Sequence, residues 1–443
     1  MSNSLRDGIT GSVLKNTMLP LMVIIICFTL QLSVAHAASR PRNRDPFEFV
    51  GVKTAEQAKQ FVVDKNEYLI ALKRPTTFSE TNQTYYCILL KGLTSLEKRV
   101  LADAEDGVLD HFETFEAALI AEGILDPAQF KEYQKRIDDV VDKVRARIRS
   151  EKLNEVQTAQ AVLEQLYSDI LTGKFDISNT NPAKVMDTGN FNCVSATLLY
   201  NVIAQRVDLT VCGLETIGHV LSRIKIGGSY VNVETTCSTW FQLLTQRERN
   251  LATTRRSART RVLDGERETV TKIPLTVIVE SESTTKFLSE RDADEDVAKN
   301  YREISDRDMI AILFYNQGFD LWQEHRYAEA IAASAKAIHI DPNNETAWSN
   351  LLGAINNLAI EFSDDHKRYD IADSLLRQLE QIEPNFKNLD MNHLSVLNQW
   401  IRVLGSEGRI DEANQVYKRA EARFPNNAML RNTIQTARRG DIR

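Results

Sequence analysis

The sequence has few cysteines for its length, and none of them are paired at the spacing of a metal or redox motif. Among 443 residues there are five cysteines, and no two are separated by the two residues typical of structural zinc or thioredoxin-like sites. Cys87, Cys193, Cys212 and Cys237 follow the N-terminal segment, and four are too few to hold a fold through disulfides. With no phosphate-binding loop or cofactor motif either, the sequence predicts a fold held by apolar burial, without a metal or cofactor.

An excess of positive charge is also missing. The formal net charge is -7, and it becomes -8 if residues 1–37, which hold Arg6, Lys15 and Asp7, are removed. This balance argues against nucleic acid as a partner. Apolar residues at 43% and charged residues at 26% are ordinary for a folded globular protein. At roughly 150 residues per domain, the length predicts two or three domains.

The apolar run near the N-terminus is too short to span a bilayer. Met18–Leu32 is fifteen residues long and contains Pro20, whereas a membrane-spanning helix needs about 20 residues. A small-x-small cleavage site, Ala35–Ala37, follows this run, so residues 1–37 are predicted to be a signal peptide. We expect an exported protein, periplasmic or extracellular. The alternative is an uncleaved anchor through residues 18–32, and only then would a membrane be a partner.

Residues 38–175 are predicted to form a helical region. Two stretches carry apolar residues at alternating spacings of three and four, typical of packed helix faces: Ala117, Ala118, Ile120, Ala121 and Ile124, then Val140, Val141, Val144 and Ile148. Between them, Asp126 is a predicted N-cap and Pro127 is suited to the first position of the second helix.

The pattern changes in residues 176–305. A polar segment at 176–192 predicts a loop, and the apolar residues 193–205 predict a helix. Strands are predicted at 209–216 and 219–226, and Gly227–Gly228 predicts a hairpin turn into a third strand at 230–236.

Residues 243–305 are predicted to be a connector. It holds one short strand at 274–279, a cluster of arginines at 247–261 and a cluster of acidic residues at 290–296. The two clusters predict a solvated linker of paired charges, with an anion-binding patch as the alternative.

Cys193 is the first candidate for chemistry. It stands at the predicted start of its helix, where unpaired backbone N–H groups and the helix dipole stabilise a thiolate. The alternative is a small buried apolar residue, the usual role of a single cysteine on an apolar helix.

The predicted hairpin supplies partners for this cysteine. A two-residue turn at Gly227–Gly228 pairs Leu221 with Glu234, so His219 and Glu234 become diagonal neighbours on one face. A carboxylate there can fix the tautomer of the imidazole. A three-residue turn would reverse the faces, leaving a core histidine and a solvated glutamate. The sequence leaves three roles open for Cys237: a buried residue, a disulfide partner of Cys212, or a resolving thiol for Cys193.

These residues carry a family resemblance. NFNCVSATLLYNVIAQRVDLTVCGLETIGHVLSRI, followed by YVNVETT, resembles the core of the bacterial transglutaminase-like superfamily, which has a papain-like fold. The resemblance implies that Cys193 is the nucleophile, His219 the base and Glu234 the orienting acid. Glu234 replaces the usual Asp, and Thr235 replaces a common Pro. Either the side chain of Asn192 or the backbone N–H of Cys193 is expected to form the oxyanion hole.

The last third of the chain contains an internal repeat. Placing Pro342 at position 32 of a 34-residue helix-turn-helix unit puts small residues at the positions where the paired helices touch, and Pro384 and Pro425 repeat the pattern. These residues are Gly318, Ala330 and Ala337, then Ala372 and Leu379, then Ala413 and Ala420. The pattern resembles three tetratricopeptide repeats and a cap helix, and implies a protein partner in their groove.

The sequence therefore predicts an α+β protein in four parts. Residues 1–37 are the signal peptide, 38–175 the helical region, 176–305 the papain-like core and connector, and 306–443 an all-α solenoid. We expect a cysteine-dependent amidase, peptidase or acyl transferase that acts on a peptide or protein amide. The alternative is a non-catalytic scaffold whose papain-like core is inert.

Overall fold

The structure, a computed structural model, describes residues 68–73, 85–90, 93–216, 218–246 and 301–440. These residues form many helices and a small antiparallel sheet, which confirms the α+β class. The predicted signal peptide, the strand at 274–279 and the two charged clusters of the connector lie outside the described residues. Within the described ranges, no helix combines the length and apolarity needed to cross a bilayer.

Two strands lie within residues 38–175, where only helices were predicted, and they precede the first described helix. Strand β1 (Tyr68–Lys73) pairs antiparallel with β2 (Tyr85–Leu90). Both are six-residue runs made mostly of apolar residues, and periodicity alone does not separate such a run from part of a helix. Tyrosine and isoleucine in both runs favour the strand.

Four helices then follow, and local capping explains where they start. Thr94 accepts a hydrogen bond from the Glu97 backbone N–H at 3.0 Å, and the Glu97 carboxylate accepts one from the Thr94 N–H at 3.0 Å. Asp126 caps the third helix by accepting from Ala128 N–H at 2.8 Å, and Pro127 takes the first helical position, as predicted. The helices are α4 (Ser95–Asp103), α5 (Thr114–Ala121), α6 (Pro127–Glu151) and α7 (Glu155–Asp169).

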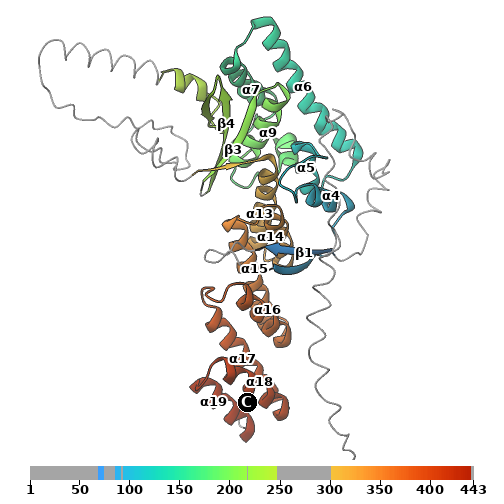
Figure 1. Cartoon of the computed structure of the whole chain (residues 1–443). Helices are drawn as coiled ribbons and strands as arrows, with labels where there is room; N and C mark the ends of the chain where they lie inside the picture. The colour runs from blue at the N-terminus through green and yellow to red at the C-terminus, as the bar shows by residue number, and fades with distance from the viewer. Residues whose placement is uncertain (1–67, 74–84, 91–92, 217, 247–300, 441–443) are drawn as a thin grey trace, which may run out of the picture. The chain divides into compact units, whose positions relative to one another are not determined.

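The centre of the described chain is one helix on a four-stranded antiparallel sheet. Helix α9 (Cys193–Arg206) packs against two neighbouring strands, β3 (Thr210–Thr216) and β4 (His219–Ile226), as Figure 1 shows. Strands β5 (Ser229–Val233) and β6 (Arg302–Ile304) complete the order β5-β4-β3-β6. The sheet therefore recruits a strand from the far end of the predicted connector.

A short helix interrupts the predicted loop at 176–192. Helix α8 (Pro182–Thr188) begins after Asn181, whose side chain accepts hydrogen bonds from the N–H groups of Ala183 and Lys184. Asparagine followed by proline is a good start for a helix, which explains the difference from the prediction.

The predicted register of the hairpin is confirmed. Ile226 pairs with Ser229 across Gly227 and Gly228, which both have positive φ, and Ser222 pairs with Val233. Strand β5 ends at Val233, so Glu234 is the first residue after the strand rather than part of it.

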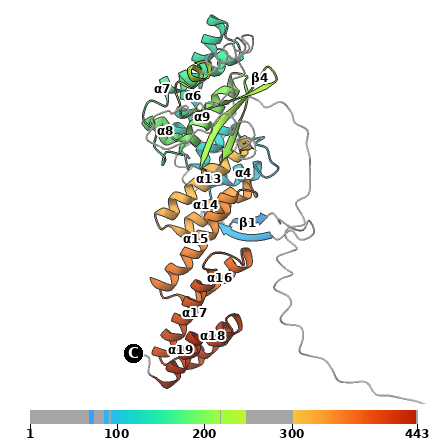
Figure 2. The ribbon, with the colours of Figure 1, turned by 90° about the vertical axis from the view of Figure 1, so that its left-hand side faces the viewer.

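The C-terminal helices form antiparallel pairs that pack one after another (Figure 2). The second helix of each pair ends two residues before Pro342, Pro384 or Pro425. Gly318 lies in a close crossing of the first pair, because a Cβ atom there would stand 2.7 Å from Ser334 Oγ. The helices are α13 (Asp306–Gln323), α14 (Tyr327–Ile340), α15 (Glu345–Asp364), α16 (Tyr369–Ile382), α17 (Leu389–Ser406), α18 (Ile410–Arg423) and α19 (Ala428–Arg439).

Helix α13 belongs to the central core as well as to the C-terminal array. It packs on α5, α9, β3 and β6, and its buried residues Ile310, Ile312 and Phe314 join the apolar cluster that contains Leu198 of α9. Gln205 near the end of α9 also donates to the Asp306 carboxylate at 2.9 Å. The predicted boundary at residue 306 thus divides the sequence but not the core.

Candidate active site

Cys193 is the first residue of α9, as predicted, and its position depends on Asn192. The Asn192 Oδ1 atom accepts hydrogen bonds from Val194 N–H at 3.0 Å and Ser195 N–H at 3.1 Å, which caps the helix. The Cys193 side chain is only partly buried. The sulfur therefore stands at the positive end of a helix dipole with access to solvent.

His219 opens β4 and lies beside Glu234. His219 pairs with Thr216 of β3, so the antiparallel pairing of β3 with β4 fixes the position of its backbone. Its Nε2 atom is 2.7 Å from Glu234 Oε2. The side chains of His219 and Glu234 are 23% and 10% exposed. The diagonal contact predicted from the hairpin register is therefore present.

The electrostatics of His219 favour the charged imidazolium. Burial alone would lower the pKa of His219, but hydrogen bonds and charge from Cys193 and Glu234 outweigh burial and raise it to about 10. Because Nε2 faces Glu234, we assign Nδ1 as the ring nitrogen that faces the sulfur. The imidazole of His219 thus lies between the Cys193 thiol and the Glu234 carboxylate.

Three threonine contacts hold Glu234 and the residue after it in place. The Glu234 Oε1 atom accepts from Thr236 N–H at 3.1 Å and from Thr236 Oγ1 at 2.5 Å. Thr235 Oγ1 lies 2.8 Å from Thr197 Oγ1 of α9. Burial would raise the pKa of Glu234, but the bonds from His219 and Thr236 hold it below its ordinary value. The longer carboxylate is therefore ionised and fixed in place.

Of the two oxyanion candidates, the geometry favours the backbone. The Asn192 Nδ2 atom donates to Ile177 O at 2.9 Å and to Thr180 Oγ1 at 2.8 Å, and the residue is 4% exposed. The amide is therefore committed to the preceding loop. Within the described part of the chain, the Cys193 N–H has no hydrogen-bond acceptor. This N–H can meet a developing negative charge.

Tyr315 of α13 is a neighbour of the site that the sequence reasoning missed. Its hydroxyl donates to Glu215 Oε1 of β3 at 3.1 Å. Burial, then Glu215 and then the charge of Cys193 raise the pKa of Tyr315. Tyr315 lies more than one hundred residues after Cys193, so no local pattern signals this proximity.

An ion-pair network continues from Glu215 into the C-terminal helices. Arg302 of β6 donates from Nη2 to Glu215 Oε2 at 2.5 Å and from Nη1 to Asp341 Oδ2 at 2.6 Å. Asp341 is the C-cap of α14 and is 2% exposed. The edge of the four-stranded sheet is therefore connected by ion pairs to the first helix pair.

The other described thiols contribute little to the site. Cys212 and Cys237 are free, so the disulfide between them, one of the three alternatives for Cys237, is not formed in this structure. Cys237 is half-buried, with Sγ 3.6 Å from Thr239 Oγ1, and it is less enclosed than predicted. In the described ranges, no group of three or more His, Cys, Asp or Glu side chains could hold a metal ion.

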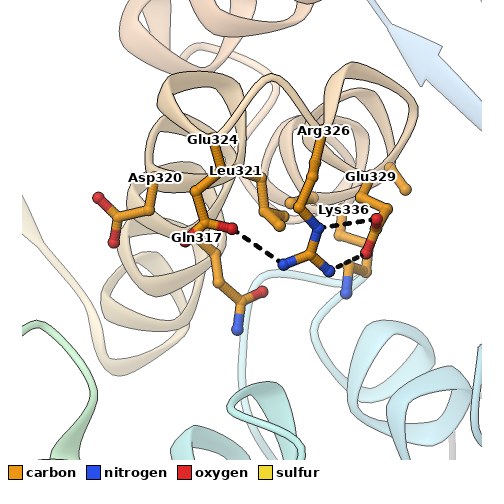
Figure 3. Close-up of a pocket in the computed structure, with 9 residues that line it drawn as sticks. Gln317, Asp320, Leu321, Glu324, Arg326, Glu329 and Lys336 are labelled. Carbon is orange, nitrogen blue, oxygen red and sulfur yellow. Dashed lines mark hydrogen bonds and ion pairs between the residues drawn. The ribbon is translucent and has the colours of Figure 1, made fainter.

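A pocket on the first helix pair is separate from Cys193. Figure 3 shows Arg326 between Glu324 and Glu329, to which it donates hydrogen bonds. Lys336, also in the pocket wall, pairs with Glu97 of α4 at 3.0 Å. Ion pairs therefore hold Arg326 and Lys336, two of the charged residues that line this pocket.

Fold and site together define an α+β protein in which a cysteine at the first position of a helix, a histidine and a carboxylate meet. No protein-family model matches the sequence, and no curated protein matches it either. What the chain does is therefore argued from the geometry of its own residues.

Proposed function

We propose that this protein is a cysteine-dependent enzyme of acyl transfer, either an amidase or peptidase or an acyl transferase, acting on a peptide or protein amide. The observation that carries the proposal is the series of Cys193, His219 and Glu234, with the imidazole 2.7 Å from the carboxylate and the cysteine at a helix start. If His219 and Glu234 were only a structural pair in the core, a thiol at a helix start beside them would have no purpose.

The proposed reaction follows from these positions. The Cys193 thiolate attacks the amide carbonyl carbon, and the carbonyl electron pair moves to oxygen, where the Cys193 N–H stabilises it. As the C–N bond breaks, the His219 imidazolium gives its proton to the leaving amine, and a thioester remains. Water or a second amine then attacks the thioester carbonyl and loses a proton to His219. The C–S bond breaks, which releases the carboxylic acid or the new amide and returns Cys193 as a thiolate beside the His219 imidazolium.

We also propose that the core is papain-like and that the C-terminal pairs are tetratricopeptide repeats. The support for the first is a cysteine helix packed on an antiparallel sheet whose strands carry the histidine and lead to the acid. The support for the second is the constant distance from each helix end to Pro342, Pro384 and Pro425.

The test measures the reactivity of each cysteine in the purified full chain. With iodoacetamide at pH 7, we expect Cys193 to be alkylated much faster than Cys212 and Cys237, as followed by peptide mass spectrometry. His219→Ala is expected to remove this difference. Equal rates for the three thiols in the unmodified chain would overturn the proposal.

A second candidate function is a non-catalytic scaffold. It is favoured by Phe319 and Trp322 of α13, whose rings are exposed and stacked at 6.1 Å between centroids. Large exposed aromatic pairs are typical of interaction surfaces. If the scaffold function is the whole function, Cys193→Ala would leave every activity of the protein unchanged.

We further propose that the protein is exported after cleavage before Ala38. The support is the pattern of residues 1–37 alone. Mass spectrometry of the protein from its native host is expected to find Ala38 at the N-terminus, whereas an intact Met18–Leu32 segment would favour the anchored alternative.

A further inference from the structure

One face of α13 carries three aromatic side chains, Tyr315, Phe319 and Trp322. Their spacings of four and three residues place them on one side of the helix. Gly318 faces α14, and Gln317 and its neighbours along the helix line the pocket of Figure 3 on a different side. Gly318 lies four residues before Trp322, so the aromatic face adjoins the side that packs on α14, whereas the polar pocket lies on another side of the helix.

The first residue of this face reaches the candidate site. Tyr315 bonds to Glu215, and Glu215 pairs across the sheet with Val220, the residue after His219. Helix α13 also packs on α9, the helix that begins with Cys193. The near end of the aromatic face is thus joined through Glu215 to β3, the strand that pairs with the strand carrying His219.

The other two residues are open to solvent. Phe319 is 44% exposed and Trp322 is 36% exposed, and their rings stack at an angle of 15° between planes. Gly353 of α15 lies beside them, because a Cβ atom there would stand 3.9 Å from Trp322 Nε1. A glycine at this place leaves the indole uncovered, as a binding surface requires.

We propose that this aromatic face, Tyr315, Phe319 and Trp322, binds the polypeptide substrate and directs it to Cys193. The proposal rests on the proposed function, and the occupant is a substrate segment with an apolar or aromatic side chain near the scissile amide. Continuity with the candidate site identifies this occupant, since Tyr315 joins the exposed rings to the residues around Cys193.

The geometry sets a length for that segment. Trp322 lies seven positions after Tyr315, a rise of about 10 Å along the helix at 1.5 Å per residue. An extended peptide covers this distance with about three residues. The apolar side chain that meets Phe319 and Trp322 is therefore expected about three residues from the one that passes Tyr315.

The experiment uses peptidyl chloromethyl ketones as probes for the full chain. Each probe carries an acetylated phenylalanine, a spacer of one to six glycines and the reactive ketone, and matched probes carry alanine, lysine or aspartate in place of phenylalanine. Each labelling rate of Cys193, from mass spectrometry, is divided by the iodoacetamide rate of the same variant. We expect the phenylalanine probe to be about tenfold faster than the alanine probe, at an intermediate spacer length only.

Variants connect this preference to the surface. Trp322→Ala is expected to abolish the phenylalanine preference, and Phe319→Ala to reduce it. Tyr230→Ala, which removes an aromatic residue 58% exposed on β5, is the matched control and is expected to keep it. Thermal unfolding of each variant checks that it is folded.

The outcomes separate the two proposals. If Cys193 does not react with iodoacetamide in the unmodified chain, the proposed function fails. If it reacts but the probes show no preference, or Trp322→Ala leaves the preference intact, the aromatic face is not a substrate site. A preference for lysine over phenylalanine also overturns the apolar occupant. A last outcome combines three results: Cys193→Ala binds the phenylalanine probe selectively, Trp322→Ala loses this binding, and the unmodified chain shows no labelling preference. That outcome would assign the surface to another partner and would also overturn the substrate site.

Discussion

Two histidine–carboxylate pairs in this protein have nearly the same geometry but different surroundings. His219 lies 2.7 Å from Glu234 beside α9, and His393 lies 2.8 Å from Asp373 between C-terminal helices. The side chains of His393 and Asp373 are only 2% and 5% exposed. A short imidazole–carboxylate contact is therefore not by itself a mark of catalysis.

The third group at each pair makes the difference. At His219 it is Cys193, whose hydrogen bond and charge help to raise the histidine pKa. At His393 it is a set of arginines, of which Arg377 approaches Asp373 at 3.1 Å. Burial would raise the pKa of Asp373, but His393 and the arginines hold it below its ordinary value. The first pair can activate a nucleophile, whereas the second neutralises buried charge.

The largest expected effect separates the two histidines by reactivity. His219→Ala is expected to slow alkylation of Cys193 by about 10²-fold or more, because the imidazolium that stabilises the thiolate is lost. His393→Ala is the matched control and is expected to change this rate by less than about twofold, in keeping with its distant role. A comparable loss in both variants would remove the distinction between the pairs.

Stability is expected to show the opposite order. His393→Ala leaves Asp373 buried with only its arginines, so we expect the free energy of unfolding to fall by about 2–4 kcal/mol. His219→Ala is expected to cost about 1 kcal/mol, because that pair is more open to water. Urea unfolding followed by circular dichroism measures both values. The comparison fails if His219→Ala is the more destabilising of the two.

The pH dependence of turnover sharpens the role of Glu234. His219 must carry a proton to protonate the leaving amine, and its pKa is about 10, so the rate is expected to fall as pH rises through about 10. Glu234→Gln removes the carboxylate that helps to raise this pKa, so the alkaline fall is expected at lower pH. Rates measured from pH 6 to 11, once a substrate is found, test this. Asp373→Asn is expected to leave the profile unmoved.

The smallest expected effect concerns the loop that holds Glu234. Thr235→Val removes the hydrogen bond to Thr197 and is expected to cost about 1 kcal/mol of stability. Thr197→Val is expected to cost a similar amount, and the double variant less than the sum, as measured by urea unfolding. Strict additivity would show that the two hydroxyls do not support each other.

Much of the local structure could be predicted from the sequence. Asn192 before an apolar run marks the start of α9, and Gly227–Gly228 sets the hairpin register that brings Glu234 to His219. These features depend on residues within a few positions of one another, so capping and turn rules suffice. The strand pair β1–β2 was missed because a six-residue run made mostly of apolar residues fits either kind of element.

The sequence by itself determined the start of the cysteine helix, the histidine strand, the side of the hairpin on which Glu234 lies, and the ends of the C-terminal helices. Only the tertiary structure decided that α13 packs into the central core, that the Tyr315 hydroxyl bonds to Glu215 of β3, and that the Asn192 amide donates its hydrogen bonds to the preceding loop. The reason is how far apart the contacting residues lie along the sequence. Caps and turns are chosen by neighbouring residues, whereas these contacts join segments from 12 to more than 100 residues apart, which only packing brings together.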